Sequence, residues 1–288
     1  MGLSIREEYL VNHELRWYKL YCYMNALRFL AYRKYILMIL KERMNFRIDF
    51  FIYLVTGFFS SYAHVAIWFV ITAAVDPAVA AKTIQYIVLS GFVGAFISAP
   101  DRDPVFIRVQ NGDIARELLY PVSFPLTVFA RGMGSAVFRA LFNGLITLII
   151  MSVIFRISWR IEEGRLAFFI LFLVLGFVLQ FLISFQVDML AFWVYETTAL
   201  HYVKEAVLGF FSGRLIPLWL YPAWIMGVLN FLPFRNIVYV PIAMLIGEIP
   251  AAAVPGELLR SLGWIVFFTI TSSLLWQSGV RKTVINGG

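Results

Sequence analysis

The stretch FFIYLVTGFFSSYAHVAIWFVITAAV, residues 50–75, decides the fold class of this chain. It contains no Asp, Glu, Lys or Arg. As an α-helix it would measure about 39 Å, which exceeds the roughly 30 Å hydrocarbon core of a bilayer. The stretch therefore predicts a membrane-spanning helix.

The composition of the whole chain agrees with a membrane protein. Of its 288 residues, 61% are hydrophobic and 14% are charged, and the mean hydropathy is +0.81. This is more apolar surface than a soluble core of this size can bury. Lipid is therefore the expected solvent for much of the chain.

Further apolar runs follow the first one. We predict additional spans at residues 83–99, 126–155 and 166–187, a fifth from about Tyr202 to a break at Gly213-Arg214, and a last at 261–280. The third span includes Arg131, expected to reach toward the inner membrane surface, and Arg139, expected to face protein or water. The prediction is an all-α, polytopic membrane protein with six transmembrane helices.

The distribution of basic residues gives the expected topology. Nine of the 24 Lys and Arg precede the first span, and Arg281 and Lys282 follow the last one. By the positive-inside rule both termini are expected in the cytoplasm, so the net charge of +7 does not indicate a nucleic-acid partner. The expected parts are a cytoplasmic N-terminal segment over 1–49 with an interfacial amphipathic helix at about 14–45, a single six-span domain over 50–282, and a cytoplasmic tail over 283–288.

Sequence motifs of common enzymatic chemistry are missing. None of the six lysines follows a glycine, so the chain lacks the phosphate-binding loop of many ATPases. The three histidines, His13, His64 and His201, lie in separate regions without metal-ligand spacing. We therefore expect no catalytic residue, no metal site and no cofactor in this chain, which is not an enzyme by itself.

Two polar residues in apolar surroundings each leave two interpretations open. His64 is either a hydrogen-bonded packing residue or a proton relay within the first span. Asp188 is either a helix-end carboxylate with a partner or a polar point near a substrate path.

Two segments carry the more specific information. The expected cytoplasmic loop over residues 101–125 contains NGDIARELLYPV at 111–122, whose glycine, charges, Leu-Leu pair and proline predict a short amphipathic helix at the membrane face. The segment FFSGRLIPL at 210–218 is followed by Pro222 and Pro233. Because each proline removes a backbone donor, the region 213–257 is expected to form broken helices that enter from the outer side and turn back.

Both segments, in this order and on this topology, resemble the membrane subunits of type-2 ABC exporters, the ABC-2-type permease family. The long N-terminal segment looks like the interfacial helix of the same family. The resemblance implies that the loop docks into a separate ATPase through Gly112, Ile114, Glu117, Leu118, Leu119 and Pro121. It also implies an outer gate at Gly213, Arg214, Pro217, Leu218, Pro222, Pro233 and Phe234.

The implied function is that of a transmembrane subunit of an ATP-driven exporter in the bacterial plasma (inner) membrane. Such a subunit forms half of the translocation path, lies among membrane lipid, and works with ATPase subunits that bind the ATP and Mg²⁺. A second permease subunit is expected, with a heterodimer favoured over a homodimer. Few charges near the path favour an amphiphilic or apolar cargo. The alternatives are a secondary transporter, which should show matching broken helices in both halves, and a membrane scaffold without cargo.

Overall fold

Every regular element in the described part of the chain is a helix. The structure, a computed structural model, describes residues 30–44, 47–74, 76–98, 105–120, 122–159, 161–194 and 197–286. After a helix over residues 30–44, the α-helices are α2 (Arg47–Ala73), α3 (Pro77–Ile97), α4 (Val105–Gln110), α5 (Ile114–Glu117), α6 (Phe124–Arg139), α7 (Leu145–Ile154), α8 (Arg165–Met189), α9 (Thr198–Phe211), α10 (Ala223–Leu229), α11 (Tyr239–Ile246) and α12 (Val254–Asn286). A π-helix, η1 (Ala140–Gly144), joins α6 to α7, and short 3-10 helices follow at η2 (Leu190–Phe192), η3 (Leu218–Leu220), η4 (Phe234–Asn236) and η5 (Ala251–Ala253).

Five helical stretches of the described residues are long and apolar enough to cross a membrane. They are Phe51–Ala73, Pro77–Ile97, Phe124–Ile154, Arg165–Phe192 and Ala251–Lys282. They cover the first four predicted spans and the last one. The predicted fifth span corresponds to α9, which has 14 residues. Its length is about 21 Å, so α9 alone is shorter than the hydrocarbon core of a bilayer.

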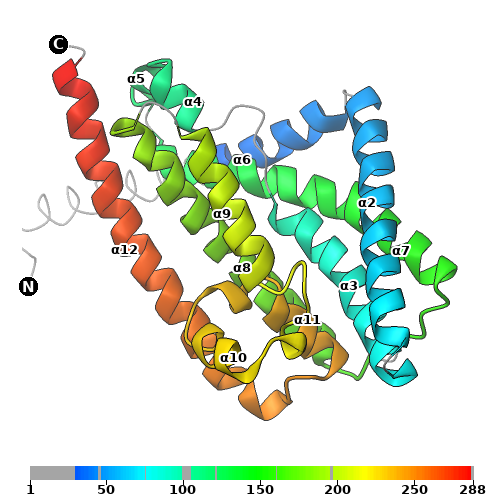
Figure 1. The fold of residues 1–288 in the computed structure, drawn as a ribbon. Helices are drawn as coiled ribbons and strands as arrows, with labels where there is room; N and C mark the ends of the chain where they lie inside the picture. The colour runs from blue at the N-terminus through cyan, green and yellow to red at the C-terminus, as the bar shows by residue number, and fades with distance from the viewer. Residues whose placement is uncertain are drawn as a thin grey trace, which may run out of the picture.

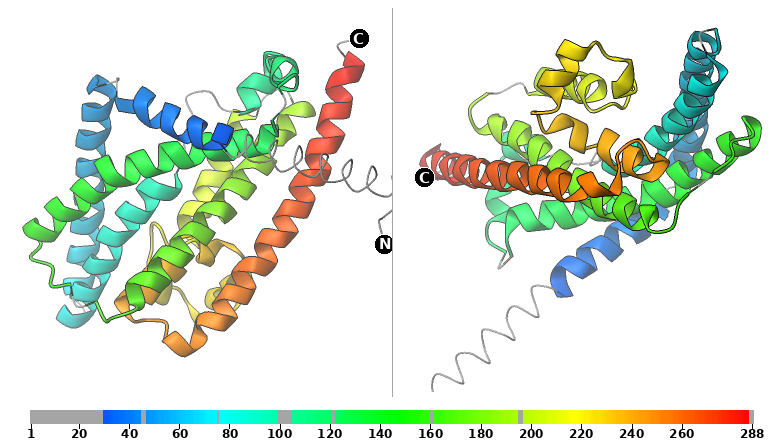
Figure 2. Two further views of the ribbon diagram at one scale, coloured as in Figure 1. Left: turned by 180° about the vertical axis from the view of Figure 1, so that it is seen from behind. Right: turned by 90° about the horizontal axis from the view of Figure 1, so that it is seen from below.

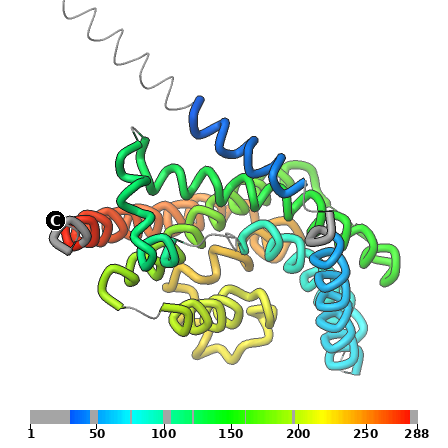
Figure 3. Tube along the Cα trace, turned by 90° about the horizontal axis from the view of Figure 1, so that it is seen from above, coloured from blue at the N-terminus to red at the C-terminus, as the bar shows by residue number. Residues whose placement is uncertain are grey.

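The two ends of the helix bundle differ in character (Figure 1). The short helices α4 and α5 and the C-terminal end of α12 lie at one end of the bundle. The short helices α10 and α11 lie at the other end. The helix over residues 30–44 runs crosswise to α2, beside the end that carries α4 and α5 (Figures 2 and 3).

Two helices begin earlier than the sequence predicted. Helix α3 begins at Pro77 instead of residue 83, because Asp76 accepts a hydrogen bond from the backbone N–H of Ala78 (2.8 Å) and proline suits the first turn. Lys82, the charged residue just before the predicted span, pairs with Glu248 (2.7 Å). Helix α12 begins at Val254 instead of residue 261, since its proline again stands in the first turn.

The third span contains a π-helical segment in its middle. There Asn143 donates a hydrogen bond to the carbonyl of Tyr53 in α2 (3.1 Å). Arg139, one residue before the segment, donates through Nε to the carbonyl of Ala95 in α3 (3.1 Å). Arg139 therefore faces protein, as expected. The wide turn directs these polar groups toward the neighbouring spans, a common use of π-helical segments.

The core of the bundle forms where α3, α8 and α11 meet. Helix α11 is buried over nearly its whole length although it has eight residues. Helix α8 packs against both α11 and α12, and α2 packs against α3. The largest fully buried apolar side chains in this region include Tyr86, Phe172, Phe177 and Ile242. Helix α11, which follows the break at Gly213, is thus part of the core.

Candidate functional site

The loop between the second and third spans folds into two short helices. Helix α4 ends at Gln110, a turn follows at 111–113, and α5 has four residues. Gly112 has φ +77°, a conformation that favours glycine, and it turns the chain between the two helices. The sequence predicted a helix at this place, but it predicted one continuous segment and missed α4.

One side of this loop is buried against the helix bundle. Ile114 has no exposed surface and belongs to a buried cluster with Val105, Phe124, Val128 and Phe185. The cluster joins α4 and α5 to the start of α6 and to α8. Displacing the loop would therefore also displace these two long helices or expose the cluster to water.

The other side of the loop is exposed, and beside the charged pair Asp113 and Arg116 it carries apolar side chains. Leu118, Leu119 and Tyr120 have relative exposures of 37%, 84% and 56%. Pro121, the last residue expected to contact an ATPase, lies outside the described residues. An exposed leucine beside an exposed tyrosine, at an end of the bundle predicted to be cytoplasmic, is a small surface on which a partner protein can dock.

Glu117 connects the loop to the third span. Its carboxylate lies 3.2 Å from the guanidinium of Arg108 in α4 and 3.9 Å from that of Arg131 in α6. The Arg108 side chain is only 2% exposed. The sequence had selected Glu117 and expected Arg131 to reach toward the inner surface, but it had not singled out Arg108. Three charges thus connect α4, α5 and α6.

The helix over residues 30–44 joins the same cluster. The guanidinium of Arg131 lies over the ring of Tyr35, 5.4 Å from its centroid. The backbone N–H of Ser123, just before α6, donates to the hydroxyl of Tyr32 (3.1 Å). A side chain at Gly134 would approach the carbonyl of Ile36 to 2.9 Å, so glycine permits close packing here.

The second candidate site is the break after α9. Gly213 has φ +87° and turns the chain sharply after Phe211. Three successive backbone carbonyls of the break accept hydrogen bonds from the first two spans. Gly213 accepts from Tyr86 (2.7 Å), Arg214 accepts from Ser90 (3.2 Å), and Leu215 is bonded to His64 (2.8 Å) and Trp68 (3.0 Å). The interpretation of His64 as a hydrogen-bonded packing residue agrees with this contact.

The remaining residues selected for the outer gate lie in and around the same turn. The side chain of Arg214 reaches Ser98 (3.0 Å) and Glu205 (3.5 Å), and Leu218 is fully buried. Pro217 and Pro222 directly precede η3 and α10, and Pro233 directly precedes η4. Phe234 stacks on Phe211 (centroids 6.3 Å apart). The prolines therefore separate short helices, as their spacing predicted.

The region after the break, which the sequence predicts to be the outer one, is connected to the last span by buried charges. Arg235 in η4 pairs with Glu257 (3.0 Å), and both side chains are at most 10% exposed. Glu257 also pairs with Arg260 (2.8 Å), and Asn236 donates to Ser261 (2.7 Å). Sequence reasoning missed this cluster, because its two halves, Arg235-Asn236 and residues 257–261, are separated by about twenty residues and form no motif.

The fold and these two sites define a class of protein. Among the described residues no group of three or more His, Cys, Asp or Glu side chains could hold a metal ion. Long apolar helices, an anchored loop at one end and a hydrogen-bonded break toward the other are features of a multi-pass membrane transport subunit.

A family model described as "ABC-2 family transporter protein" matches residues 39–287. The chain therefore belongs to the ABC-2 transporter family, and it is a permease of this type, as the sequence motifs had indicated. No curated protein matches the chain.

Proposed function

We propose that this chain is the transmembrane subunit of an ATP-driven exporter and forms half of the path for an amphiphilic or apolar cargo. The observation that carries the proposal is the loop around α5. It presents Leu119 at 84% exposure while Glu117, two residues earlier, is bonded to the third span. An exposed apolar surface on a mechanically anchored loop is suited to receive force from a partner.

The partner is a separate ATPase that binds ATP and Mg²⁺. Closure of the ATPase would press on Leu118 and Leu119. The ion pairs of Glu117 would pass this displacement to α6, and the buried Ile114 would pass it to α8. Because packed cores respond as units and not by gradual deformation, a small shift at the loop could tilt whole helices.

The topology proposed for this mechanism has six crossings and both termini in the cytoplasm of a bacterium. Helix α9 would supply most of the fifth crossing, and the segment from Gly213 to residue 253 would form the outer, re-entrant part. The three carbonyls bonded to α2 and α3 would hold this outer part closed. A tilt of these spans would break the bonds and open the route outward.

A second permease subunit, a relative of this chain or a second copy, would complete the path. Helix α2 supports this idea, because large apolar residues such as Phe59, Ile67 and Val70 are between 56% and 69% exposed along it. A related but different subunit remains the favoured partner. The scarcity of charge on α2 and α3 favours a cargo that is itself largely apolar.

The proposal is tested by co-purification from native membranes in mild detergent, followed by mass spectrometry and an ATPase assay. The test variant is Leu119→Asp, and the matched control is Ile161→Asp, which changes a 47% exposed residue in the loop before α8. We expect an ABC ATPase to accompany the wild type and the control and to be lost from Leu119→Asp.

Absence of any ATPase under conditions that preserve a known ABC complex would overturn the proposal and favour a secondary transporter or a scaffold. Equal loss of the ATPase in the control variant would move the docking surface away from α5.

A further inference from the structure

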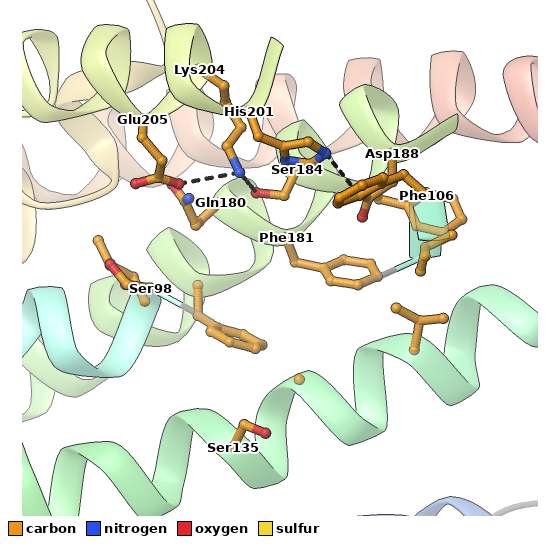
Figure 4. A pocket seen from close by; sticks show the side chains of 16 residues that line it. Ser98, Phe106, Ser135, Gln180, Phe181, Ser184, Asp188, His201, Lys204 and Glu205 are labelled. Atoms are coloured by element: carbon orange, nitrogen blue, oxygen red, sulfur yellow. Dashed lines mark hydrogen bonds and ion pairs between the residues drawn. The ribbon is translucent and has the colours of Figure 1, made fainter. Parts of the chain in front are cut away.

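A cavity of about 410 Å³ lies between α4, α6, α8 and α9 (Figure 4). Its volume is within the range of pockets that hold small organic ligands. Val105 and Phe106 of α4 line one part of it, so the cavity borders the loop described above. None of the residues selected from the sequence as site residues lines it.

The walls of the cavity are divided into an apolar and a polar part. Two stripes with a spacing of four residues run along α8 beside the cavity: an aromatic stripe of Phe177, Phe181 and Phe185, and a polar stripe of Gln180, Ser184 and Asp188. Side chains four apart share one face of a helix. Helix α9 faces the polar stripe with His201, Lys204 and Glu205 (Figure 4). A ligand in this space would need one apolar and one polar side.

The charges of the polar part are separated into two ends. At one end the carboxylate of Asp188 lies 3.1 Å from Nε2 of His201, without the alignment of a hydrogen bond. At the other end Lys204 contacts Ser184 (3.0 Å) and Glu205 (3.2 Å), and Arg214 also reaches Glu205. The first end carries a carboxylate beside an imidazole, and the second carries two cations to one carboxylate. The two ends lie about one helical turn apart, roughly 5–6 Å.

Two buried polar groups in the cavity wall have no partner within the described protein. Gln180 is 6% exposed and Ser135 of α6 is 4% exposed, and both line the cavity. No hydrogen bond joins either side chain to another described residue, yet neither side chain has a polar atom that is both fully buried and unpaired. Their polar atoms therefore keep surface that is open to the cavity, where water or the polar part of a ligand can form hydrogen bonds with them.

We propose that this cavity binds a zwitterionic amphiphile, with its anionic group beside Lys204, its ammonium group beside Asp188 and its apolar body among the phenylalanines of α8. Asp188 can accept the ammonium in addition to His201 and its other contacts, because a carboxylate has about four acceptor positions. Lys204 retains a third N–H for the anion. Gln180 and Ser135 hydrogen-bond to the polar linker of the ligand. The proposal does not depend on the presence of an ATPase.

The chemistry fits two sources, a zwitterionic lipid headgroup or a free zwitterion with apolar groups. The test therefore uses two matched pairs of probes with the protein in nanodiscs of phosphatidylglycerol. Myristoyl lysophosphatidylethanolamine is compared with myristoyl lysophosphatidylglycerol, which lacks the ammonium group. The dipeptide phenylalanyl-phenylalanine is compared with its N-acetyl form. Native mass spectrometry counts the probe molecules bound to the folded chain.

We expect at least one zwitterion to bind one molecule per chain, at least tenfold more tightly than its partner without the ammonium. In Gly132→Leu this binding is lost, because Gly132 lines the cavity and its nearest side chain, Phe177, lies 3.9 Å from an added Cβ, leaving space that the leucine would fill. Gly263→Leu, on an open face of α12, is the control and keeps wild-type binding.

In Asp188→Asn we expect the preference for the zwitterion to fall at least tenfold. The binding of its partner probe, which lacks the ammonium group, is unaffected. Equal binding of both members of each pair, absence of binding, or full binding in Gly132→Leu would each overturn the proposal. The pair that shows the preference identifies the source of the ligand.

Discussion

Replacing Glu117 by glutamine should weaken the transmission of the ATPase's movement to the membrane helices without preventing the ATPase from docking. The variant removes the charge that Arg108 and Arg131 share, while the exposed surface of Leu119 is unchanged. Breaking a fully buried ion pair costs about 3–5 kcal/mol. Arg108 retains other interactions, and glutamine can still accept a hydrogen bond, so we take about 2 kcal/mol, typical of one charged hydrogen bond. This cost corresponds to a roughly 30-fold shift in the equilibrium between the loop held by the Glu117 ion pairs and the loop detached from α6, in favour of the detached loop.

The assay compares the amount of ATPase that co-purifies with the permease-dependent rate of ATP hydrolysis in nanodiscs. In Glu117→Gln we expect the co-purified amount to stay within about twofold of wild type, and the permease-dependent rate to fall about tenfold or more. The control is Glu163→Gln, which removes an exposed carboxylate from the loop before α8. An unchanged rate in Glu117→Gln, or the same loss in Glu163→Gln, would refute the reasoning.

Three further predictions concern the break at Gly213 and the short helices that follow it. Tyr86→Phe leaves the carbonyl of Gly213 without its buried donor and should destabilise the fold by about 1–3 kcal/mol in chemical unfolding, whereas an unchanged midpoint would show that the bond is not needed. Gly213→Ala should destabilise the fold by about 1–2 kcal/mol because of the positive φ, and further because the new Cβ approaches the Tyr86 hydroxyl. The double variant Tyr86→Phe/Gly213→Ala lacks this hydroxyl, so it should cost less than the sum of the two single variants. Strict additivity would argue against the contact. Glu257→Gln should cost roughly 3 kcal/mol because Arg235 stays buried without its counter-charge, and replacing both residues by methionine should recover most of the loss in the same measurement.

The spans could be predicted from the sequence because lipid excludes charge. A run such as residues 50–75 has almost no other interpretation, and the structure places a long apolar helix there. The exceptions are informative. Lys82 lies inside α3 because Glu248, far away in sequence, neutralises it. Helix α12 begins at Val254, before its predicted first residue, because Pro255 stands in the first turn, where its missing N–H has no cost.

The sites were predicted less completely. Leu119 and Glu117 could be selected because the loop is continuous in sequence, and the break at Gly213 could be selected from its glycine and prolines. Arg108 could not be distinguished from other loop charges without knowing that it is buried. The cavity could not be predicted, since its polar residues come from different helices and form no sequence motif, although Asp188 had been noted as a polar residue in apolar surroundings. The sequence left two interpretations of Asp188 open, and its contact with His201 agrees with that of a helix-end carboxylate that has a partner.

The central claim, that the surface around α5 receives an ATPase, is tested most directly by site-specific crosslinking. Cys22 is the only cysteine, so Cys22→Ser gives a background without thiols for Leu119→Cys and, as the control, Ile161→Cys. Treatment of native membranes with a short thiol-to-amine crosslinker should join the Leu119→Cys chain to an ABC ATPase and leave the Ile161→Cys chain unjoined. Crosslinks to an ATPase from Ile161→Cys alone, or none from either chain in membranes where the ATPase is present, would contradict the account.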